Sequence, residues 1–332
     1  MTPETDPFVL IVGDRDDWSI EVVAAALRDN GTRLAVFDTA DFPQRTTLHA
    51  RYESCWDTWL TIDGQQVRLA EVTAVYYRRP GDFDLPEGLS APESRFARAQ
   101  ARIALGGLIN GLGTRWLNHP VAMADAEYKP RQLQVAASVG LPAPATIITN
   151  NPAAVRRFAT RVGPIVVKPL AEPVIAEAGG ISIAYTRLLD TTELTDLSGV
   201  SSTAHLFQQW IDLRHAVRLT AVGGNLFAVA IHPQSEAARV DWRADYDAHR
   251  YELIQPPIPI RDAVLAYLKE FRLAYGAFDF VVSADGAWWF LECNSAGQWG
   301  WVAEACGLPI ADAIADYLTG DAVSLTGKAV SR

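Results

Sequence analysis

The stretch Gly276–Trp301 constrains this chain most, because two apolar runs in it each carry one acidic residue. The runs AFDFVVS and AWWFLEC flank an Asp285-Gly286 pair, the strongest short-range signal for a two-residue hairpin turn. Counting outwards from that turn pairs Asp279 with Glu292, with their Cβ atoms about 4.5–5.5 Å apart on one face. The sequence therefore predicts two carboxylates side by side in an apolar hairpin.

Paired carboxylates in an apolar setting repel each other and lose hydration, so a cation is expected between them. Asn294 lies two residues beyond Glu292, on the same face of the strand, and adds a third oxygen. A small set of oxygen ligands suits Mg²⁺, which keeps several waters and is often shared with substrate phosphates. We therefore predict that Asp279, Glu292 and Asn294 bind Mg²⁺. The alternative is a shifted register that leaves both acids in solvent at strand ends.

Length and composition describe an ordinary globular protein. The chain has 332 residues, of which 49% are hydrophobic and 20% charged, enough for two or three packed units. The formal net charge of −10 disfavours nucleic acid as the main partner. Its three cysteines have neither metal nor disulfide spacing, as is usual in a reducing cytosol. The sequence shows no signal peptide and no run long enough to span a membrane, so we predict a cytoplasmic protein.

The first part of the chain predicts an α/β unit. Phe8–Gly13 and Arg33–Asp38 are expected to be buried strands on either side of a helix over Ser19–Arg28, which is a βαβ opening. The glycines of this segment do not form a dinucleotide-binding fingerprint. Arg78 and Arg79 follow a later strand, where they could meet an anionic substrate or lie in a solvated loop.

Two more features are predicted in this unit. Residues 56–62 and 66–69 are expected to form a hairpin around Asp63-Gly64. A long helix is predicted over Pro92–Leu112, with a partial apolar stripe. The residues of this stripe are Phe96, Ile103, Leu108 and Leu112.

The middle of the chain predicts a small β-rich unit that carries lysines. Lys129 lies in the segment 125–139 that leads into its strands, and Lys168 stands at the exit of the strand PIVVKP. An ammonium group there is costly unless it reaches water or a partner, and a phosphate is a natural partner. The small residues at 178–182 could cover phosphates through backbone N–H groups, although an ordinary hairpin turn is a fair alternative. Residues 204–211 are expected to form a strand.

The last part of the chain contains the acidic hairpin. Another hairpin is predicted around Gly223-Gly224-Asn225. Arg218 lies within its first strand, and a charged residue at that position is expected to serve a purpose other than solubility. Asp241, Trp242 and Arg243 are placed in a polar loop. Trp299 and Trp301 are expected to pack the helix that follows, with an aromatic wall for a peptide as the alternative.

Together these motifs resemble the ATP-grasp superfamily and, within it, the ribosomal peptide maturases that make graspetides, the microviridin-type ligases. No Walker A sequence or kinase catalytic loop competes with this resemblance. One departure is DLRHAVR at 212–218, where such enzymes often carry a lysine before the last arginine, so that Arg214 or His215 must serve instead. The motifs that carry the resemblance are YYRRP at 76–80, VVKP at 166–169, FQQWI at 207–211, DWR at 241–243, GAFDF at 276–280 and FLECNSAGQWGW at 290–301.

The resemblance implies an α/β (α+β) chain with the ATP-grasp fold in three units. These are a Rossmann-like pre-ATP-grasp domain at 1–120, a central β-rich subdomain at 121–212 and a C-terminal subdomain with the Mg²⁺ site at 213–325. Lys129 and Lys168 would bind ATP, and the metal set would carry two Mg²⁺ ions. The hinge residues that would line the adenine pocket through backbone groups are Gln208, Gln209, Trp210 and Ile211.

The resemblance also implies carboxylate activation. ATP would phosphorylate an Asp or Glu side chain of a precursor peptide, and a Ser, Thr or Lys side chain would then close a macrolactone or macrolactam. Arg218 and Arg243 would contact the phosphoryl group, because guanidinium forks match phosphate oxygens. Asp241 or His232 could accept the hydroxyl proton.

Further expectations concern partners and alternatives. A precursor with a leader segment and a homodimer are expected from the family. A ligase that joins a free amino acid to a small acid or peptide terminus is the alternative enzyme. A nucleotide-binding regulatory module without turnover is the alternative outside enzymes, which the paired carboxylates and both arginines argue against.

Overall fold

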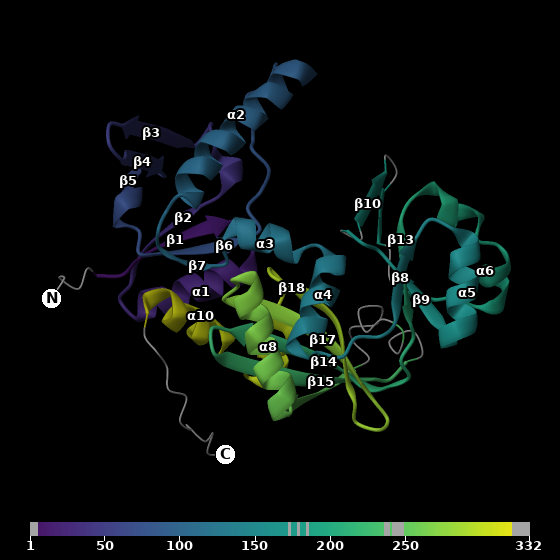
Figure 1. The fold of residues 1–332 in the computed structure, drawn as a ribbon. Coiled ribbons are helices and arrows are strands. Elements are labelled where there is room, and N and C mark those ends of the chain that lie inside the picture. Colours follow the sequence, from purple (N-terminus) through teal and green to yellow (C-terminus); the bar gives the residue numbers. More distant parts are fainter. Residues whose placement is uncertain are drawn as a thin grey trace.

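The structure, a computed structural model, describes residues 6–171, 174–177, 180–183, 186–235, 240 and 249–320, with 174–177 and 180–183 described as backbone only (Figure 1). Two predicted features therefore lie wholly or partly outside the described residues. They are Asp241, Trp242 and Arg243 in the polar loop, and residues 178 and 179 of the small segment 178–182.

The N-terminal unit is built on a parallel sheet in the order β2-β1-β6-β7. Helix α1 joins β1 to β2, which confirms the βαβ opening. The expectation that both strands are buried is wrong for β2, because β2 lies at the sheet edge and only Phe37 in it is buried. The elements are β1 (Phe8–Gly13), α1 (Trp18–Asp29), β2 (Arg33–Phe37), β6 (Ala74–Arg78) and β7 (Arg115–Leu117).

A three-stranded antiparallel sheet extends this unit. The hairpin of β4 (Trp56–Ile62) and β5 (Gln65–Arg68) is confirmed. Asp63 and Gly64 both have positive φ, 49° and 79°, as a type I′ turn requires. Strand β3 (Thr46–Tyr52) was not predicted; its exposure alternates along the strand, but Thr46 is its only buried residue, so the apolar signal is weak. Short 3₁₀ turns are η1 (Thr39–Asp41) and η2 (Leu69–Glu71).

Helix α2 (Ala91–Asn110) corrects the predicted apolar stripe. It begins in a capping box in which Ser90 and Glu93 satisfy each other's backbone N–H groups. Leu105 and Ile109 are buried, whereas Phe96 and Ile103 are 67% and 70% exposed. The start of the helix extends away from the body of the protein (Figure 1), so its large apolar side chains have nothing to pack against.

The central unit is an antiparallel sheet in the order β12-β9-β13-β8, which stands to one side of the molecule (Figure 1). Helix α5 is capped at its start by Asn151, whose side chain accepts from Ala153 N–H at 2.9 Å. A separate hairpin comprises β10 (Val174–Glu177) and β11 (Gly180–Ile183). The other elements are β8 (Thr146–Thr149), α5 (Pro152–Val162), β9 (Ile165–Lys168), β12 (Arg187–Leu188), α6 (Thr191–Thr195), η3 (Ser198–Ser202) and β13 (His205–Gln209).

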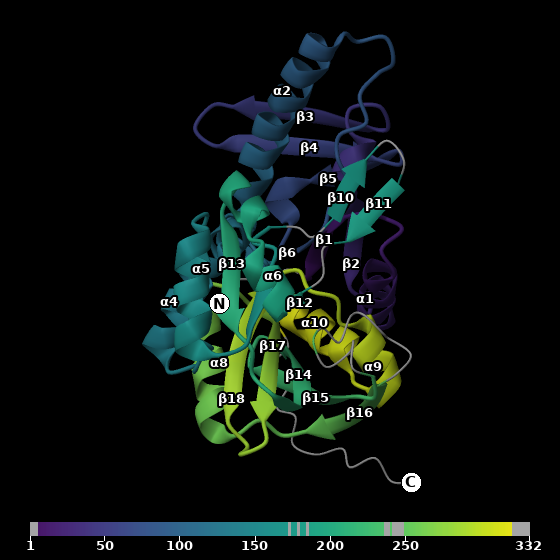
Figure 2. The same cartoon turned by 90° about the vertical axis from the view of Figure 1, so that its right-hand side faces the viewer.

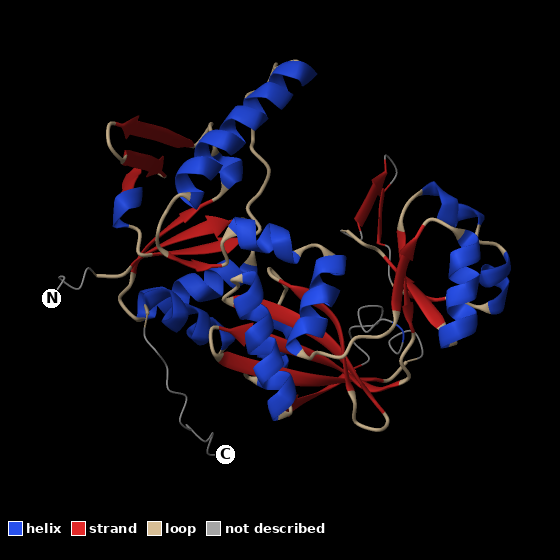
Figure 3. Ribbon diagram, viewed as in Figure 1, coloured by secondary structure: helices blue, strands red, loops and turns tan. Residues whose placement is uncertain are grey.

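The C-terminal unit is a five-stranded antiparallel sheet in the order β16-β15-β14-β17-β18, with helices on both faces (Figure 3). On one face, aromatic side chains such as Tyr267, Phe278 and Phe290 form a core with the helices α3, α4 and α8. The strands are β14 (Leu213–Val222), β15 (Asn225–Pro233), β16 (His249–Ile254), β17 (Tyr275–Ser283) and β18 (Trp288–Asn294). The helices on this face are α3 (Pro120–Ala126), α4 (Lys129–Val139) and α8 (Ile258–Phe271).

The other face of this sheet packs against the N-terminal unit. Helices α9 (Gly300–Cys306) and α10 (Ile310–Thr319) lie with α1 on one side of the molecule (Figure 2). One continuous core joins Ile11 of β1, Val229 of β15 and Ile314 of α10. The N-terminal and C-terminal units therefore share a core and hold each other in a fixed orientation. Within the described residues, no helix is both long and apolar enough to cross a bilayer.

The corrected face of α2 can be tested by two alanine substitutions. Leu105→Ala should cost about 2–5 kcal/mol of stability, because it leaves a cavity in a closed core. Ile103→Ala should change stability by no more than about 0.5 kcal/mol, because its side chain is in solvent. Thermal unfolding of both variants checks this. Equal losses would contradict the assignment of the two faces.

Candidate functional site

The acidic hairpin brings its two carboxylates together by a different route from the one predicted. The pairing of Asp279 with Glu292 is confirmed. The two-residue turn is wrong, because Gly286 N–H donates to Ser283 O at 2.9 Å and Gly286 has φ of 86°, which makes a longer loop. This loop shifts the register by one residue near the turn.

A β-bulge restores the register where it matters. Phe280 pairs with Phe290 rather than with Leu291, and the ladder is irregular between Asp279 and Phe280. Leu291 is the extra residue, so Glu292 again lies opposite Asp279 and on the same face. Without this bulge, Glu292 would point to the aromatic core on the other side of the sheet.

Each carboxylate has a cation of the protein beside it. Arg218 lies opposite Asp279 on the neighbouring strand β14, and its Nη1 is 3.2 Å from Oδ1 and 3.3 Å from Oδ2. Both side chains are almost fully buried, at 7% and 6% exposure. Lys129, the first residue of α4, places Nζ 2.5 Å from Glu292 Oε2. These cations offset the repulsion and desolvation of the paired acids.

Asn294 completes the set of oxygen donors. It ends β18 on the same face as Glu292, and its Nδ2 donates to Glu292 Oε1 at 3.5 Å. Among the described residues, no three His, Cys, Asp or Glu side chains gather as a metal cluster. Two carboxylates and one amide oxygen fit a hard cation such as Mg²⁺ that takes its other ligands from water and from a phosphate substrate.

Gln132 clamps the backbone between Glu292 and Asn294, a role that no sequence signal indicated. Its Nε2 donates to Cys293 O and its Oε1 accepts from Cys293 N–H, both at 2.9 Å. Strand β18 is the sheet edge, and this buried amide satisfies the edge groups that a further strand would otherwise pair. Helix α4 thus supplies both Lys129 and the support for the ligand strand.

Arg78 is neither a solvated loop residue nor an exposed anion site, which corrects both interpretations of it. Its side chain is 2% exposed and all five of its N–H donors have acceptors. The adjacent Arg79 donates from Nε to Ala296 O at 3.1 Å. The acceptors of Arg78 are the side chains of Asp17, Ser19 and Gln298 and the carbonyl groups of Ala296 and Gly297.

Asp17 is the anionic partner of Arg78 and also the N-cap of α1. One carboxylate oxygen accepts from Ser19 N–H at 2.8 Å, and the other accepts from Arg78 Nε at 3.1 Å. Burial alone would raise the pKa of Asp17, but the hydrogen bonds from Ser19 and the charge of Arg78 hold that pKa below its usual value.

The lysine and hinge residues predicted for a nucleotide lie around β13. Lys168 Nζ donates to Gln208 Oε1 at 2.8 Å, and Gln208 Nε2 donates to Thr146 Oγ1 at 3.0 Å. The backbone N–H groups of Gln209 and Trp210 donate to Ala145 O and Pro164 O, at 2.8 and 2.9 Å. Trp210 and Ile211 follow β13 in the connection to β14.

The two histidines named as candidates face away from the carboxylates. Arg218 pairs with Val229, so His232, three residues further along β15, points to the opposite face of the sheet. His215 is on that opposite face as well, 5.2 Å from His232 between ring centroids. His232 is therefore wrong as a general base at this site, and His215 is wrong as the replacement for the missing lysine.

The two tryptophans after the ligand strand are part of the packing. Trp299 is 1% exposed and its ring centroid is 5.7 Å from that of Trp18 in α1, as expected for a core residue. Trp301 lies 5.5 Å from Tyr251, and the guanidinium carbon of Arg218 is 5.9 Å from its ring centroid. Trp301 thus also contributes a cation–π contact to the carboxylate site.

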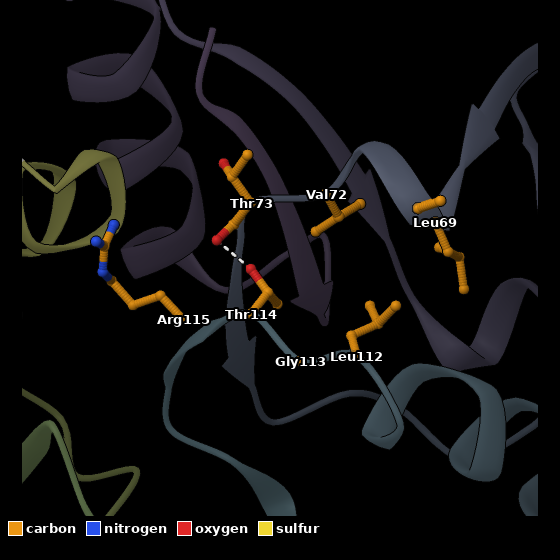
Figure 4. A pocket seen from close by; sticks show the side chains of 8 residues that line it. Leu69, Val72, Thr73, Leu112, Gly113, Thr114 and Arg115 are labelled. Atoms are coloured by element: carbon orange, nitrogen blue, oxygen red, sulfur yellow. Dashed lines mark hydrogen bonds between the residues drawn. The ribbon is translucent and has the colours of Figure 1, made fainter. Parts of the chain in front are cut away.

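A wide hollow of about 510 Å³ lies elsewhere, at the end of the N-terminal sheet (Figure 4). Thr114 Oγ1 donates to the carbonyl of Thr73 beside it, and Arg115 is turned to Leu318 O, at 3.1 Å. In the part of the chain that the structure describes, Arg115 is the one charged residue in its lining, and no group of charged side chains points into it, so this hollow is not assigned as the catalytic site. The lining residues are Leu69, Ala70, Val72, Thr73, Leu112, Gly113, Thr114 and Arg115.

Comparison with known proteins gives one family profile and several solved structures. The profile, described as the MvdD pre-ATP grasp domain, matches residues 8–124. No curated protein sequence matches the chain. A RiPP-associated ATP-grasp ligase from Chryseobacterium gregarium, in complex with ADP and a leader and core peptide, aligns with TM-score 0.88 and 27% identity over 96% of this chain and 98% of its own.

Two macrocyclase and ligase structures are also similar. Macrocyclase MdnC from Microcystis aeruginosa MRC, bound with precursor peptide MdnA, aligns with TM-score 0.84 and 30% identity over 94% of this chain and 99% of its own. ATP-grasp ligase PsnB, complexed with a phosphomimetic variant of its minimal precursor, Mg and ADP, aligns with TM-score 0.77 and 27% identity, covering 95% and 99%.

The Asp17–Arg78 contact predicts a pH-dependent stability. Asp17→Asn should lower stability by about 1.5–3 kcal/mol at neutral pH, because asparagine still caps α1 but the charged hydrogen bond is lost. Since the pKa of Asp17 is lowered in the folded protein, its contribution is complete above the ordinary aspartate pKa and is lost as pH falls through the folded value.

Thermal midpoints of wild type and Asp17→Asn, measured from pH 7 downwards, check this prediction. The difference between the two proteins should shrink at acidic pH. Asp57→Asn is the matched control, because it breaks an exposed pair with Arg68 and should change the midpoint little. A difference for Asp17→Asn that stays constant with pH would contradict the role given to its charge.

Proposed function

The chain belongs to the ATP-grasp peptide ligases of the microviridin type, and from this we propose that it closes side-chain rings in a ribosomal precursor peptide at the expense of ATP. The observation that carries the proposal is the set of Asp279, Glu292 and Asn294 on one sheet face, in which Asp279 is buried and the other two are partly buried, with Arg218 and Lys129 against it. A binding module that does no chemistry needs neither the paired carboxylates nor the fixed guanidinium.

The proposed nucleotide site lies between the central and C-terminal sheets. Lys129 and Lys168 would hold the phosphates of ATP. The hinge Gln208–Ile211 would contact adenine. Because the N–H groups of Gln209 and Trp210 already donate within the protein, we propose that the backbone at Ile211 makes this contact. The structures of similar ligases with ADP support this proposal.

Asp279, Glu292 and Asn294 are proposed to hold two Mg²⁺ ions. Mg²⁺, when bound, neutralises phosphate oxygens and the charge that develops on them during transfer. We propose that Lys129 moves from Glu292 to the phosphates as nucleotide arrives, which leaves Glu292 to the metal. Arg218 is proposed to stay on Asp279 and to contact the transferred group.

The proposed chemistry has two steps. A side-chain carboxylate oxygen of Asp or Glu in the peptide attacks the γ-phosphorus, the bond to ADP breaks, and an acyl phosphate forms. A Ser or Thr hydroxyl, or a Lys amine, of the same peptide then attacks the acyl carbon, phosphate leaves, and the nucleophile loses its proton. The peptide loses one water for each ring, and positioning with electrostatic stabilisation supplies most of the rate.

Arg218 and Arg243 are proposed to stabilise the phosphoryl group, and Asp241 to accept the proton. The opposite-face position of His232 supports Asp241 over the histidine. The acid and Arg243 are two residues apart in a segment outside the described residues, so their assignment rests on the family motif.

The remaining proposals concern the whole molecule. We propose a pre-ATP-grasp domain at 1–120, a central subdomain at 121–212 and a C-terminal subdomain at 213–325, with α3 and α4 packed on the C-terminal sheet. A homodimer and a leader-bearing precursor are proposed from the family. A cytoplasmic location is proposed because Cys55, Cys293 and Cys306 are all free thiols.

Intact mass of a co-expressed candidate precursor tests the function. Wild type should remove one water, 18 Da, per ring, and Asp279→Asn should remove none, because the metal set and the partner of Arg218 are both lost. His232→Gln should retain the activity, since His232 faces away. An unchanged peptide mass, with ADP released only when free amino acids are supplied, would instead support the small-molecule ligase.

The proposed movement of Lys129 predicts linked metal and nucleotide binding. Mn²⁺, followed by electron paramagnetic resonance, should bind weakly to the free protein and more tightly with ADP. Lys129→Met should bind Mn²⁺ without nucleotide roughly tenfold more tightly than wild type, because no ammonium competes for Glu292. Lys269→Met, an exposed lysine of α8, is the control. Equal Mn²⁺ affinities of wild type and Lys129→Met would contradict the proposed movement of Lys129 away from Glu292.

A further inference from the structure

The segment that follows the last metal-site residue is shaped by side chains. Residues 295–298 leave the sheet after Asn294 and cross towards the N-terminal unit. Three consecutive carbonyl groups in this segment each accept a side-chain hydrogen bond. The donors are Asn118 Nδ2 to Ser295 at 2.9 Å, Arg78 Nη1 to Ala296 at 2.7 Å and Tyr275 Oη to Gly297 at 2.7 Å.

Arg78 is the centre of this network. It comes from the end of β6, 218 residues before Ala296, and binds both the carbonyl groups and the Gln298 side chain, the last at 2.7 Å. Burying a guanidinium to this extent destabilises the fold unless each of its N–H donors has an acceptor. Here Asp17 neutralises it and the 295–298 segment supplies three of the five acceptors.

The segment has no room to move independently of the ligand strand. A Cβ on Gly297 would lie 2.4 Å from Ala277 Cβ and 3.1 Å from Asn294 Cβ. Ala277 is the residue paired with Asn294 across the ladder. The backbone that Arg78 holds is therefore packed directly on Asn294 and on the strand opposite it, so a displacement of this backbone is transmitted to Asn294.

We propose that Arg78 is a positioning residue for the metal site, through which the N-terminal unit fixes Asn294 and, two residues earlier, Glu292. This inference rests on the proposed function, because it assigns Arg78 a role towards the metal ligands of that site. Arg78 touches neither carboxylate. It acts through the backbone of 295–298, as outer contacts to a metal site do, and such contacts change metal affinity by about 10–100-fold.

The test compares Mn²⁺ affinity in the presence of ADP, by electron paramagnetic resonance, with thermal midpoints of the same proteins. Arg78→Met should weaken Mn²⁺ binding by about 10–100-fold. Arg78→Lys should fall between it and wild type, because an ammonium has three donors where the guanidinium has five. Gln298→Leu removes one acceptor of Arg78 at an exposed position and should weaken Mn²⁺ binding by about two- to tenfold.

Arg115→Met is the matched control. Arg115 also joins the N-terminal sheet to the C-terminal part of the chain, through Leu318 O at 3.1 Å, but away from the carboxylates. The Arg115→Met variant should have a lower thermal midpoint than wild type but the same Mn²⁺ affinity. A loss of affinity in both arginine variants would overturn the proposal in favour of a general effect of stability.

The remaining outcomes separate this proposal from the proposed function. Wild-type Mn²⁺ affinity in folded Arg78→Met overturns the positioning role alone. If Arg78→Met does not fold, Gln298→Leu decides, and unchanged Mn²⁺ affinity in that variant overturns the role. Wild-type protein that binds no Mn²⁺ even with ADP overturns the proposed function, and the role of Arg78 with it.

Discussion

The ion pair between Arg218 and Asp279 imposes the main constraint on this structure. Two charges with 7% and 6% exposure are tolerated in a sheet only if their partners and surroundings are fixed. The pair lies between neighbouring strands of one ladder, so its geometry depends on the register of β14, β17 and β18. Packing on both faces of the sheet fixes that register. One face carries the aromatic core, and the other carries the core shared with the N-terminal unit.

The sequence predicted which side chains meet on this face of the sheet better than it predicted the backbone that brings them together. Asp279 and Glu292 could be paired because each is the one acidic residue of an apolar strand, and the structure confirms that pairing. The loop and the bulge at Leu291 could not be predicted, because two one-residue shifts cancel and leave the same pair opposite each other. A prediction of contacts can thus be correct when the backbone path behind it is wrong.

Other features could not be predicted from the sequence, either because the contacting residues are far apart in the chain or because residue type alone was misleading. Gln132 and Arg78 act on backbone groups 161 and 218 residues away, and such contacts leave no local pattern. The stripe on α2 was assigned to the wrong face because Phe96 and Ile103 are large, whereas the buried face uses Ala101 with Leu105 and Ile109. His232 and His215 were attractive as residue types, and only the strand register shows that they face away.

The central unit is attached to the rest of the chain in a particular way. Its core, with Val155, Phe158 and Phe207, shares no residue with the other cores among the described residues. The connection that enters it and the one that leaves it run together, since Gln209 N–H donates to Ala145 O. Two adjacent chain crossings can act as one hinge, and a rotation of this unit about them would leave its core intact. Such a rotation would be taken up by changes in φ and ψ at a few residues of the two crossings, and its free-energy cost would be independent of the stability of either sheet.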